Sequence, residues 1–360
     1  MRKIPFKQAV GEATAQAMER DPDVFLMGVG IDEPKGIFGT TVEPVKKFGP
    51  ERAFDCPISE NALTGAAVGA AMVGMRPILV HARMDFLMLT MDQLVNHAAK
   101  WRYMSGGKLA TPIVVRAVVG KGWGQAAQHS QNLHALLAHV PGINVAAPSC
   151  AYDAKGLLAE ALSIDTPTVF VEHRTLHETV DDVPEEWYRV AFGSSIARRS
   201  GADLTIVAFG HMVGEALRAA DALKKRCICA DVIDLRTVSP WDKQAVLASV
   251  RRSGRLLALD ASWKSFGIAA EICASVADEA FSALKAPPRR VALPDIPTPC
   301  SSVLEKAYYP DAATVAMEAL GLFQDDFGAS KLEIAQSVLE ALGLDPAQAT
   351  ATASGIRGPF

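Results

Sequence analysis

Short runs of apolar residues recur along the chain and alternate with longer segments in which apolar positions repeat every three or four residues. The short runs are typical of buried strands, and the longer segments are typical of amphipathic helices. Regular alternation of the two favours parallel strands in a sheet that helices cover on both faces. We therefore expect an α/β protein with two domains, each a mainly parallel sheet flanked by helices.

The first domain is expected over residues 1–177. Its predicted elements are helices over 5–20, 84–103 and 151–163 and strands over 24–29, 77–80, 111–116, 144–147 and 168–172. A further helix of small residues is expected over 62–74.

An acidic stretch, 178–186, interrupts the periodicity and predicts a linker over 178–190. Strand and helix patterns then resume over 191–323, which predicts a second, smaller α/β domain. In the tail, 324–360, one helical stripe is expected to dock on a partner surface or on the second domain. The stripe consists of Leu332, Ala335, Val338, Leu339 and Leu342.

Glu60 stands between a short turn and the run of small residues that ends at Gly74. A helix of such residues is thin, so another backbone can approach it closely, and its first turn presents unpaired N–H groups beside the Glu60 carboxylate. This arrangement suits a tight interface or a cofactor. The alternative is that Glu60 only complements the helix dipole behind an N-cap at Ser59, which contributes under about 1 kcal/mol.

Composition restricts the class of protein. The chain has 360 residues, a net charge of −4 and 49% hydrophobic residues, with no block of like charge. Nucleic acid is therefore an unexpected partner, and no apolar run is long enough for a membrane span. Together with an N-terminus that lacks an apolar signal core, these features favour the cytoplasm.

Six cysteines are scattered through apolar segments, which does not indicate a disulfide framework in a chain of this length. Cys227 and Cys229 are the one close pair, and we interpret them as part of a buried core strand rather than a metal site. No metal-binding cluster is predicted within this chain.

A glycine-rich segment over 119–131 includes Gly120, Gly122 and Gly124, followed by a polar cluster. Glycine at this density permits sharp turns and close approach to a ligand. The segment lacks the G-x-G-x-x-G spacing of dinucleotide-binding folds, so a Rossmann dehydrogenase is disfavoured.

Several motifs together resemble the beta subunit of thiamine-diphosphate-dependent 2-oxo acid dehydrogenases of the pyruvate and branched-chain type. The resemblance covers roughly residues 3–320 and implies a transketolase-type pyrimidine-binding domain followed by a transketolase C-terminal-type domain. The motifs that carry it are Asp55-Cys-Pro-Ile-Ser-Glu60, Gly65 to Met72, Asp92-Gln-Leu-Val-Asn96, Tyr103-Met-Ser-Gly-Gly107, Ala127-Gln-His-Ser-Gln131, Asp153-Ala-Lys-Gly156, Asp234-Leu-Arg236 and Pro297-Thr-Pro299.

The resemblance implies roles for particular side chains. Glu60 matches the glutamate that hydrogen-bonds the aminopyrimidine ring and assists deprotonation of the thiazolium carbon, a task suited to a partly desolvated carboxyl with a raised pKa. Phe86 matches the aromatic residue that stacks on the pyrimidine, and Ile58 and Ala82 are expected beside the cofactor. His129 matches a histidine near the reacting carbon, where it can protonate intermediates.

The chain also departs from the family pattern. Members usually carry an acidic residue directly after the strand that matches Pro77-Ile-Leu, whereas this chain reads Val80-His81-Ala82-Arg83. His81 and Arg83 are therefore expected to recognise a different acid substrate, with Gln128 as a third candidate. The family's potassium site is not carried over.

A second chain is expected to complete the site. Thiamine diphosphate enzymes anchor the diphosphate through a divalent metal held by a Gly-Asp-Gly segment, and no such segment occurs in the 360 residues. The resemblance thus implies an alpha subunit that supplies the Mg²⁺ site, an alpha2-beta2 heterotetramer and a lipoyl acyltransferase as one acceptor.

The predicted function is decarboxylation of a 2-oxo acid and passage of the acyl or aldehyde unit to a lipoyl protein or another acceptor. Two alternatives stay open. One is a subunit of a split transketolase-like carboligase. The other is a non-catalytic scaffold subunit, motivated by bulky residues over 260–269 where the family has glycines.

Overall fold

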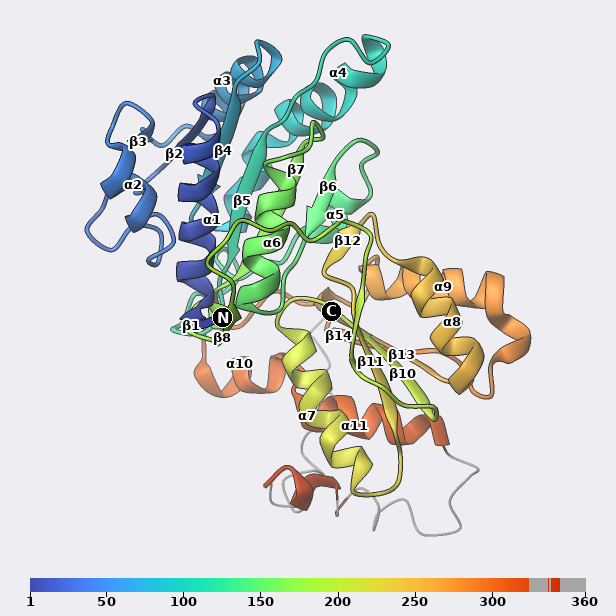
Figure 1. The fold of residues 1–360 in the computed structure, drawn as a ribbon. Coiled ribbons are helices and arrows are strands. Elements are labelled where there is room, and N and C mark those ends of the chain that lie inside the picture. Colours follow the sequence, from blue (N-terminus) through green and yellow to red (C-terminus); the bar gives the residue numbers. More distant parts are fainter. Residues whose placement is uncertain (324–335, 337, 344–360) are drawn as a thin grey trace. The chain divides into compact units, whose positions relative to one another are not determined.

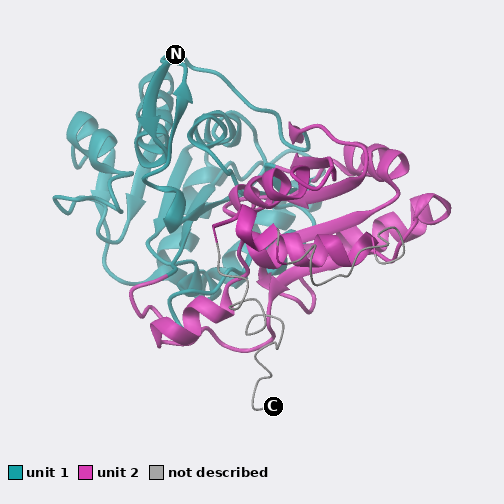
Figure 2. Cartoon of the chain, turned by 90° about the horizontal axis from the view of Figure 1, so that it is seen from below, with its two compact units in different colours: residues 1–121, 128–194, 236–240 teal, residues 122–127, 195–235, 241–360 magenta. Residues whose placement is uncertain are grey.

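The computed structural model describes residues 1–323, 336 and 338–343. The chain divides into two units, one of residues 1–121, 128–194 and 236–240 and the other of 122–127, 195–235 and 241–360 (Figure 2). The expected α/β fold with a mainly parallel sheet in each unit is confirmed. Within the described ranges, no helix combines the length and apolarity needed to cross a membrane.

The first unit contains a seven-stranded sheet, seen with its helices in Figure 1. Its strands are β2 (Val24–Gly28), β3 (Ala53–Asp55), β4 (Arg76–His81), β5 (Val114–Val119), β6 (Asn144–Ala146), β7 (Thr168–His173) and β12 (Thr237–Ser239). Its α-helices are α1 (Phe6–Arg20), α2 (Val42–Phe48), α3 (Glu60–Met72), α4 (Ala99–Met104), α5 (His134–Ala138) and α6 (Ala151–Ala161). The spatial order of the strands is β12-β6-β7-β5-β4-β2-β3, and β12 pairs antiparallel to β6 while the other pairings are parallel.

Both faces of this sheet are buried, because alternate residues of one strand point to opposite sides. Leu26 and Ile78 belong to the core that α1 and α6 form on one face. Leu79 and Val115, which alternate with that set, are also buried. A parallel sheet covered in this way leaves the carboxyl ends of its strands as the natural place for a ligand.

The segment predicted as a linker contains a strand, which corrects that prediction. β8 (Val180–Val183) pairs antiparallel with β1 (Arg2–Pro5). Val183 is fully buried while Val180 is exposed, so the acidic residues between them lie on a two-stranded ribbon rather than in free coil. The pairing joins residues almost 180 positions apart and leaves no local periodic signal.

The single long helix expected over 84–103 is wrong. The chain there forms a 3₁₀ helix, η1 (Met84–Thr90), a π-helical stretch, η2 (Asp92–Ala98), and then α4. Buried Met84, Leu87 and Thr90 recur every three residues, which matches a 3₁₀ helix but not the 3.6-residue period of an α-helix. The positions that are buried therefore determine which type of helix forms in this segment.

The strand expected over 111–116 lies three residues further on, as β5. Pro112 has no N–H for a sheet ladder. The Ile113 amide instead donates to the Thr111 carbonyl, and the Thr111 hydroxyl donates to the Ala98 carbonyl, at 2.7 Å in both cases. Because of these bonds and the proline, the strand begins only at Val114.

The second unit contains a five-stranded sheet of order β14-β13-β10-β11-β9, in which β9 is antiparallel to β11. Its core includes residues of α7 and α11 on one face. The strands are β9 (Ile196–Arg199), β10 (Leu204–Ala208), β11 (Ala230–Asp234), β13 (Leu256–Trp263) and β14 (Arg289–Leu293). The helices are α7 (Met212–Lys224), α8 (Lys243–Ser253), α9 (Ile268–Ala280), α10 (Ser302–Tyr308) and α11 (Ala312–Leu320), with 3₁₀ turns η4 (Phe281–Ala283) and η5 (Gly321–Phe323).

One expectation for the second unit is wrong, and another falls partly outside the described residues. Cys227 and Cys229 are exposed, because β11 begins only at Ala230 and Cys227 has a positive φ of 60°, so the buried-strand interpretation of this pair is wrong. In the tail, Val338 is buried in the core of the second unit. Leu332 and Ala335 of the predicted stripe lie outside the described residues.

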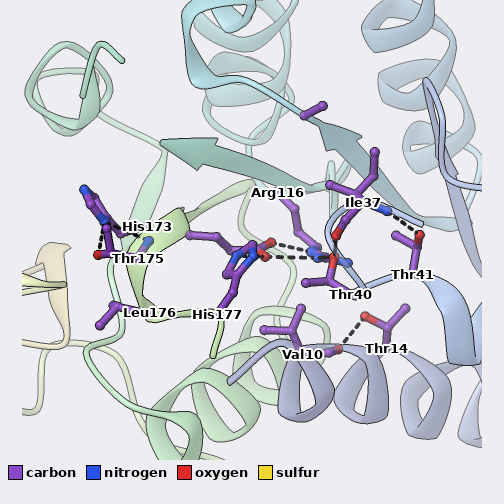
Figure 3. A network of polar contacts seen from close by, with 12 residues as sticks. Val10, Thr14, Ile37, Thr40, Thr41, Arg116, His173, Thr175, Leu176 and His177 are labelled. Atoms are coloured by element: carbon purple, nitrogen blue, oxygen red, sulfur yellow. Dashed lines mark hydrogen bonds and ion pairs between the residues drawn. The ribbon is translucent and has the colours of Figure 1, made fainter. Parts of the chain in front are cut away.

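A buried polar network fixes the loop that follows β2. Arg116 on β5 donates to Glu172 on β7 at 2.7 Å and to the Thr40 hydroxyl at 2.6 Å, and both charged side chains are fully buried (Figure 3). Burial alone would raise the pKa of Glu172, but the Arg116 guanidinium and His177 outweigh it and lower this pKa to about 2. The loop is therefore tied to the middle of the sheet by a charged pair.

Candidate functional site

A cavity of about 370 Å³ opens at the carboxyl ends of β2 and β4, beside the start of α3. Its lining residues are Gly28, Val29, Ile58, Glu60, Leu63, Leu79, Val80, His81, Ala82, Arg83, Phe86 and Leu89. The wall is thus mainly apolar with a few polar groups, which is the usual make-up of a small-molecule site.

The turn before α3 is held in place by Asp55, the last residue of β3. Its Oδ1 accepts hydrogen bonds from the backbone amides of Gly30 and Ile31, which follow β2. The ends of two neighbouring strands are thereby joined. This contact sets the position from which the chain runs through Ile58 to Glu60.

Glu60 is the first residue of α3 and is half-buried at the cavity wall. Ser59 occupies the N-cap position but makes no side-chain capping bond. No described residue donates a hydrogen bond to the Glu60 carboxylate, whereas its backbone carbonyl accepts one from the Thr64 hydroxyl at 2.8 Å. The carboxylate is therefore available to a ligand in the cavity.

Phe86 and Ile58 lie at the same cavity and are 39% and 79% exposed. Large apolar side chains that are exposed together around a cavity usually mark a binding site for a ligand or a partner. The ring of His129 meets the ring of Phe86 edge to face, with centroids 5.5 Å apart and an interplanar angle of 83°. His129 thus lies next to the cavity although it is not part of its lining.

His81 and Arg83 differ in charge. Burial lowers the pKa of His81 to about 4, so this imidazole is neutral at neutral pH and cannot serve as the basic group that the sequence suggested. Its Nε2 is buried without a hydrogen-bond partner among the described residues. Arg83 is half-buried, and burial lowers the pKa of its guanidinium, yet an arginine remains charged.

Arg83 is supported by the loop after β2. Its guanidinium lies over the ring of Phe38 at 4.9 Å, and Arg174 lies over the same ring at 4.8 Å. Phe38 has a positive φ of 51°, so the backbone is held in an unusual conformation there. Two cations on one ring concentrate positive charge at the edge of the cavity.

The structure brings together six of the residues named from the sequence, namely Ile58, Glu60, His81, Ala82, Arg83 and Phe86. Gln128 is exposed and does not line the cavity.

Asp85 is not among the residues named from the sequence, in which it stands only near the start of the helix expected over 84–103. It is 7% exposed and bonds to Gln131. A carboxyl directly before an aromatic residue of the site was the available signal.

A larger cavity of about 570 Å³ lies elsewhere in the first unit, between α1, α2 and the loop before α2. Lys7 and Lys47 at its wall already pair with Glu178 and Glu19. None of the residues named from the sequence lines it. The smaller cavity at the strand ends is therefore the candidate site.

Comparison with protein families matches two domain models. Residues 2–179 match the transketolase pyrimidine-binding domain, and residues 183–315 match the transketolase C-terminal domain. A solved structure described as a split gene transketolase, inactive beta4 tetramer, superposes with a TM-score of 0.72 over 95% of this chain and 99% of that chain. Its 22% sequence identity supports the fold alone.

Curated relatives include the beta subunit of acetoin:2,6-dichlorophenolindophenol oxidoreductase from Cupriavidus necator, 45% identical over 88% of this chain and 97% of the relative. The beta subunit of 2-oxoisovalerate dehydrogenase from Bacillus subtilis is 38% identical over 90% of this chain and 100% of its own length. The beta subunit of the pyruvate dehydrogenase E1 component from the same organism is 38% identical over 86% and 96%.

Proposed function

Because this chain belongs to the family of beta subunits of thiamine-diphosphate-dependent 2-oxo acid dehydrogenases, we propose that it decarboxylates a 2-oxo acid and passes the acyl or aldehyde unit to an acceptor. The observation that carries this proposal is the free Glu60 carboxylate in one cavity with the exposed ring of Phe86.

The cavity suits an aminopyrimidine ring. Such a ring needs a hydrogen-bond partner at one edge and apolar contact on its faces. Glu60 offers an acceptor that no described residue uses, while Phe86, Ile58 and Ala82 offer apolar surface around it. These residues would hold the pyrimidine half of thiamine diphosphate.

Thiamine diphosphate, when bound, supplies an electron sink for the carbanion left by loss of carbon dioxide. Glu60 holds and releases a proton at the edge of the aminopyrimidine. His129, held against Phe86, is placed to donate a proton to the reacting group. Leu63, Leu79 and Leu89 give the cavity an apolar wall.

The remaining half of the cofactor site belongs to an alpha subunit, which the names of the curated relatives imply. We assign Mg²⁺ and the diphosphate to that subunit and an alpha2-beta2 heterotetramer to the assembly, with a lipoyl acyltransferase as one acceptor. All six cysteines are free thiols, which suits the reducing cytoplasm that we propose as its location.

Arg83 is assigned to recognition of an anionic group on the substrate, with His81 as a neutral hydrogen-bonding group beside it and Gln128 at the approach. Arg83→Glu is expected to raise the Michaelis constant for an anionic substrate about 10-fold to 100-fold, because a charge-assisted hydrogen bond is lost, with a smaller effect on kcat. Unchanged kinetics would show that Arg83 does not take part in recognition of the substrate.

Glu60→Gln tests the proposal. In the enzyme assembled with its alpha subunit, turnover of 2-oxo acids should fall about 10²-fold to 10⁴-fold, the usual contribution of a general acid or base, while folding stays intact. Turnover is measured as carbon dioxide released in the presence of an artificial electron acceptor.

Glu43→Gln is the matched control, since Glu43 also lies in the first turn of a helix but outside this cavity. If both variants retain wild-type turnover, Glu60 only complements the helix dipole and the chain is a scaffold. If the wild-type enzyme transfers ketose fragments without releasing carbon dioxide, it is a carboligase instead.

A further inference from the structure

Asp85 is a buried carboxyl that lies between two residues of η1, Met84 and Phe86. Its Oδ1 accepts two hydrogen bonds from one residue, at 3.1 Å from the Gln131 backbone amide and at 3.0 Å from the Gln131 side-chain amide. The two residues are 46 positions apart in the sequence, and both belong to the first unit.

The neighbouring side chains of η1 contact the same distant segment. The Sδ atom of Met84 accepts a hydrogen bond from the Leu133 amide at 3.4 Å. The ring of Phe86 meets the ring of His129. Three successive residues of η1 thus contact positions 129, 131 and 133, which are spaced two apart in the sequence.

That segment has little hydrogen bonding of its own. Residues 120–133 contain no helix or strand. No backbone amide from 126 to 133 donates to a backbone carbonyl, whereas the amides of Gln131 and Leu133 donate to the side chains of η1. Buried backbone amides need partners, so the conformation of the segment depends on Asp85 and Met84.

We propose that Asp85 is a positioning residue that holds His129 against Phe86 by accepting both hydrogen bonds from Gln131. This assignment rests on the proposed function insofar as His129 acts on the substrate. Asp85 itself acts through Gln131 and does not line the cavity.

The role needs an acceptor atom rather than a charge. Burial raises the pKa of Asp85, with hydrogen bonds from Gln131 and the charge of His129 acting in the opposite direction. Its Oδ2 is buried without a partner among the described residues. An asparagine keeps one carbonyl oxygen for Gln131 and avoids the cost of burying a charge. Asp85→Asn should therefore preserve the position of His129, whereas Asp85→Ala should not.

Hydrogen–deuterium exchange of the full chain tests this directly, without any requirement for activity. In Asp85→Ala, the amides of Gln131 and Leu133, which donate to side chains of η1, should exchange at least about tenfold faster than in the wild type, while Asp85→Asn should match the wild type. Asp92→Ala and Asp92→Asn are the matched controls, because Asp92 is an exposed carboxylate on the adjoining η2 and contacts only near neighbours in the sequence, Gln93, Asn96 and His97. They should leave this segment unchanged.

Steady-state kinetics of the enzyme assembled with its alpha subunit supply the second readout. Asp85→Ala should lower kcat about 10-fold to 100-fold with little change in the Michaelis constant, because misplacement of a reacting group by about 1 Å has such an effect. Asp85→Asn should restore kcat to within about threefold of the wild type. Gln131→Ala removes one of the two bonds and should give a smaller loss, which keeps the test open if Asp85→Ala fails to fold.

Equal protection of the segment in Asp85→Ala and wild type would overturn the proposal. Equal loss of kcat in Asp85→Asn and Asp85→Ala would also overturn it, because the charge and not the acceptor would then matter. Failure of the proposed function is distinguishable from both, since it appears as an inactive wild-type enzyme with the exchange pattern unaffected.

Discussion

At the scale of single residues, the surroundings of two buried groups in the first unit have opposite effects on their charge. The Arg116 guanidinium keeps Glu172 ionised in a fully buried position, whereas burial without a charged partner keeps His81 neutral. Arg83 retains its charge at the edge of the same cavity and shares the ring of Phe38 with Arg174. Charge at each position therefore follows from what packs around the side chain.

His81 makes the stability of the chain sensitive to acid. Its pKa in the folded state is about 4, below the value near 6.5 in the unfolded state, so between these values the unfolded chain binds the proton and stability falls as the pH falls. From pH 7 to pH 5 this one group should contribute a loss of about 2 kcal/mol in the free energy of unfolding.

His81→Phe should remove that loss, as measured by denaturant unfolding at both pH values. His97→Phe is the control, because His97 is about half exposed on η2. If His81→Phe and the wild type lose equal stability between pH 7 and pH 5, the imidazole is not held neutral by burial.

At the scale of elements, α3 is unusual because most of its side chains are small. Gly69 is exposed, and a Cβ added there would meet no atom within 4 Å. The chain itself therefore has room for a side chain at this position. We propose that an alpha subunit packs closely against the helix at this glycine.

Gly69→Leu should leave the fold of the isolated chain intact, and its helix should gain up to about 1 kcal/mol, because leucine is a better helix former than glycine. The same substitution should weaken association with the alpha subunit at least about tenfold, as measured by analytical ultracentrifugation. Gly214→Leu on α7 is the matched control, since it is also an exposed helical glycine with no atom within 4 Å. Equal association by the two variants would show that α3 does not face the partner.

At the scale of the whole molecule, the two units carry the two domain types of one family, but the chain contains no Gly-Asp-Gly segment. In the described residues, no cluster of three or more His, Cys, Asp or Glu side chains forms a metal site. If the cofactor site is divided between two kinds of subunit, as proposed, the isolated chain should have a low affinity for the cofactor.

The isolated chain should not bind thiamine diphosphate with Mg²⁺ more tightly than about millimolar, whereas the assembled enzyme should bind in the micromolar range, a difference of about 4 kcal/mol. Isothermal titration of both preparations measures this. Micromolar binding by the chain alone would refute the shared site, and the titration of the assembled enzyme controls for an inactive cofactor preparation.

The sequence by itself determined the fold class, most strands and helices and the family. These features have local or nearly local signals, such as the apolar runs of β2, β4 and β7 and the segment from Asp55 to Glu60. The family resemblance also named six residues that the structure places at one cavity, beside the carboxyl ends of β2 and β4.

Only the tertiary structure decided the remainder. Residues 84–104 wind in three different ways because their buried positions must meet the sheet, and β8 exists because β1 offers it a partner far away in sequence. The neutrality of His81 depends on burial, and the bonds between Asp85 and Gln131 depend on contact across 46 positions. The physical reason is common to these cases, since burial and long-range contact arise when the chain packs and leave no periodic pattern along it.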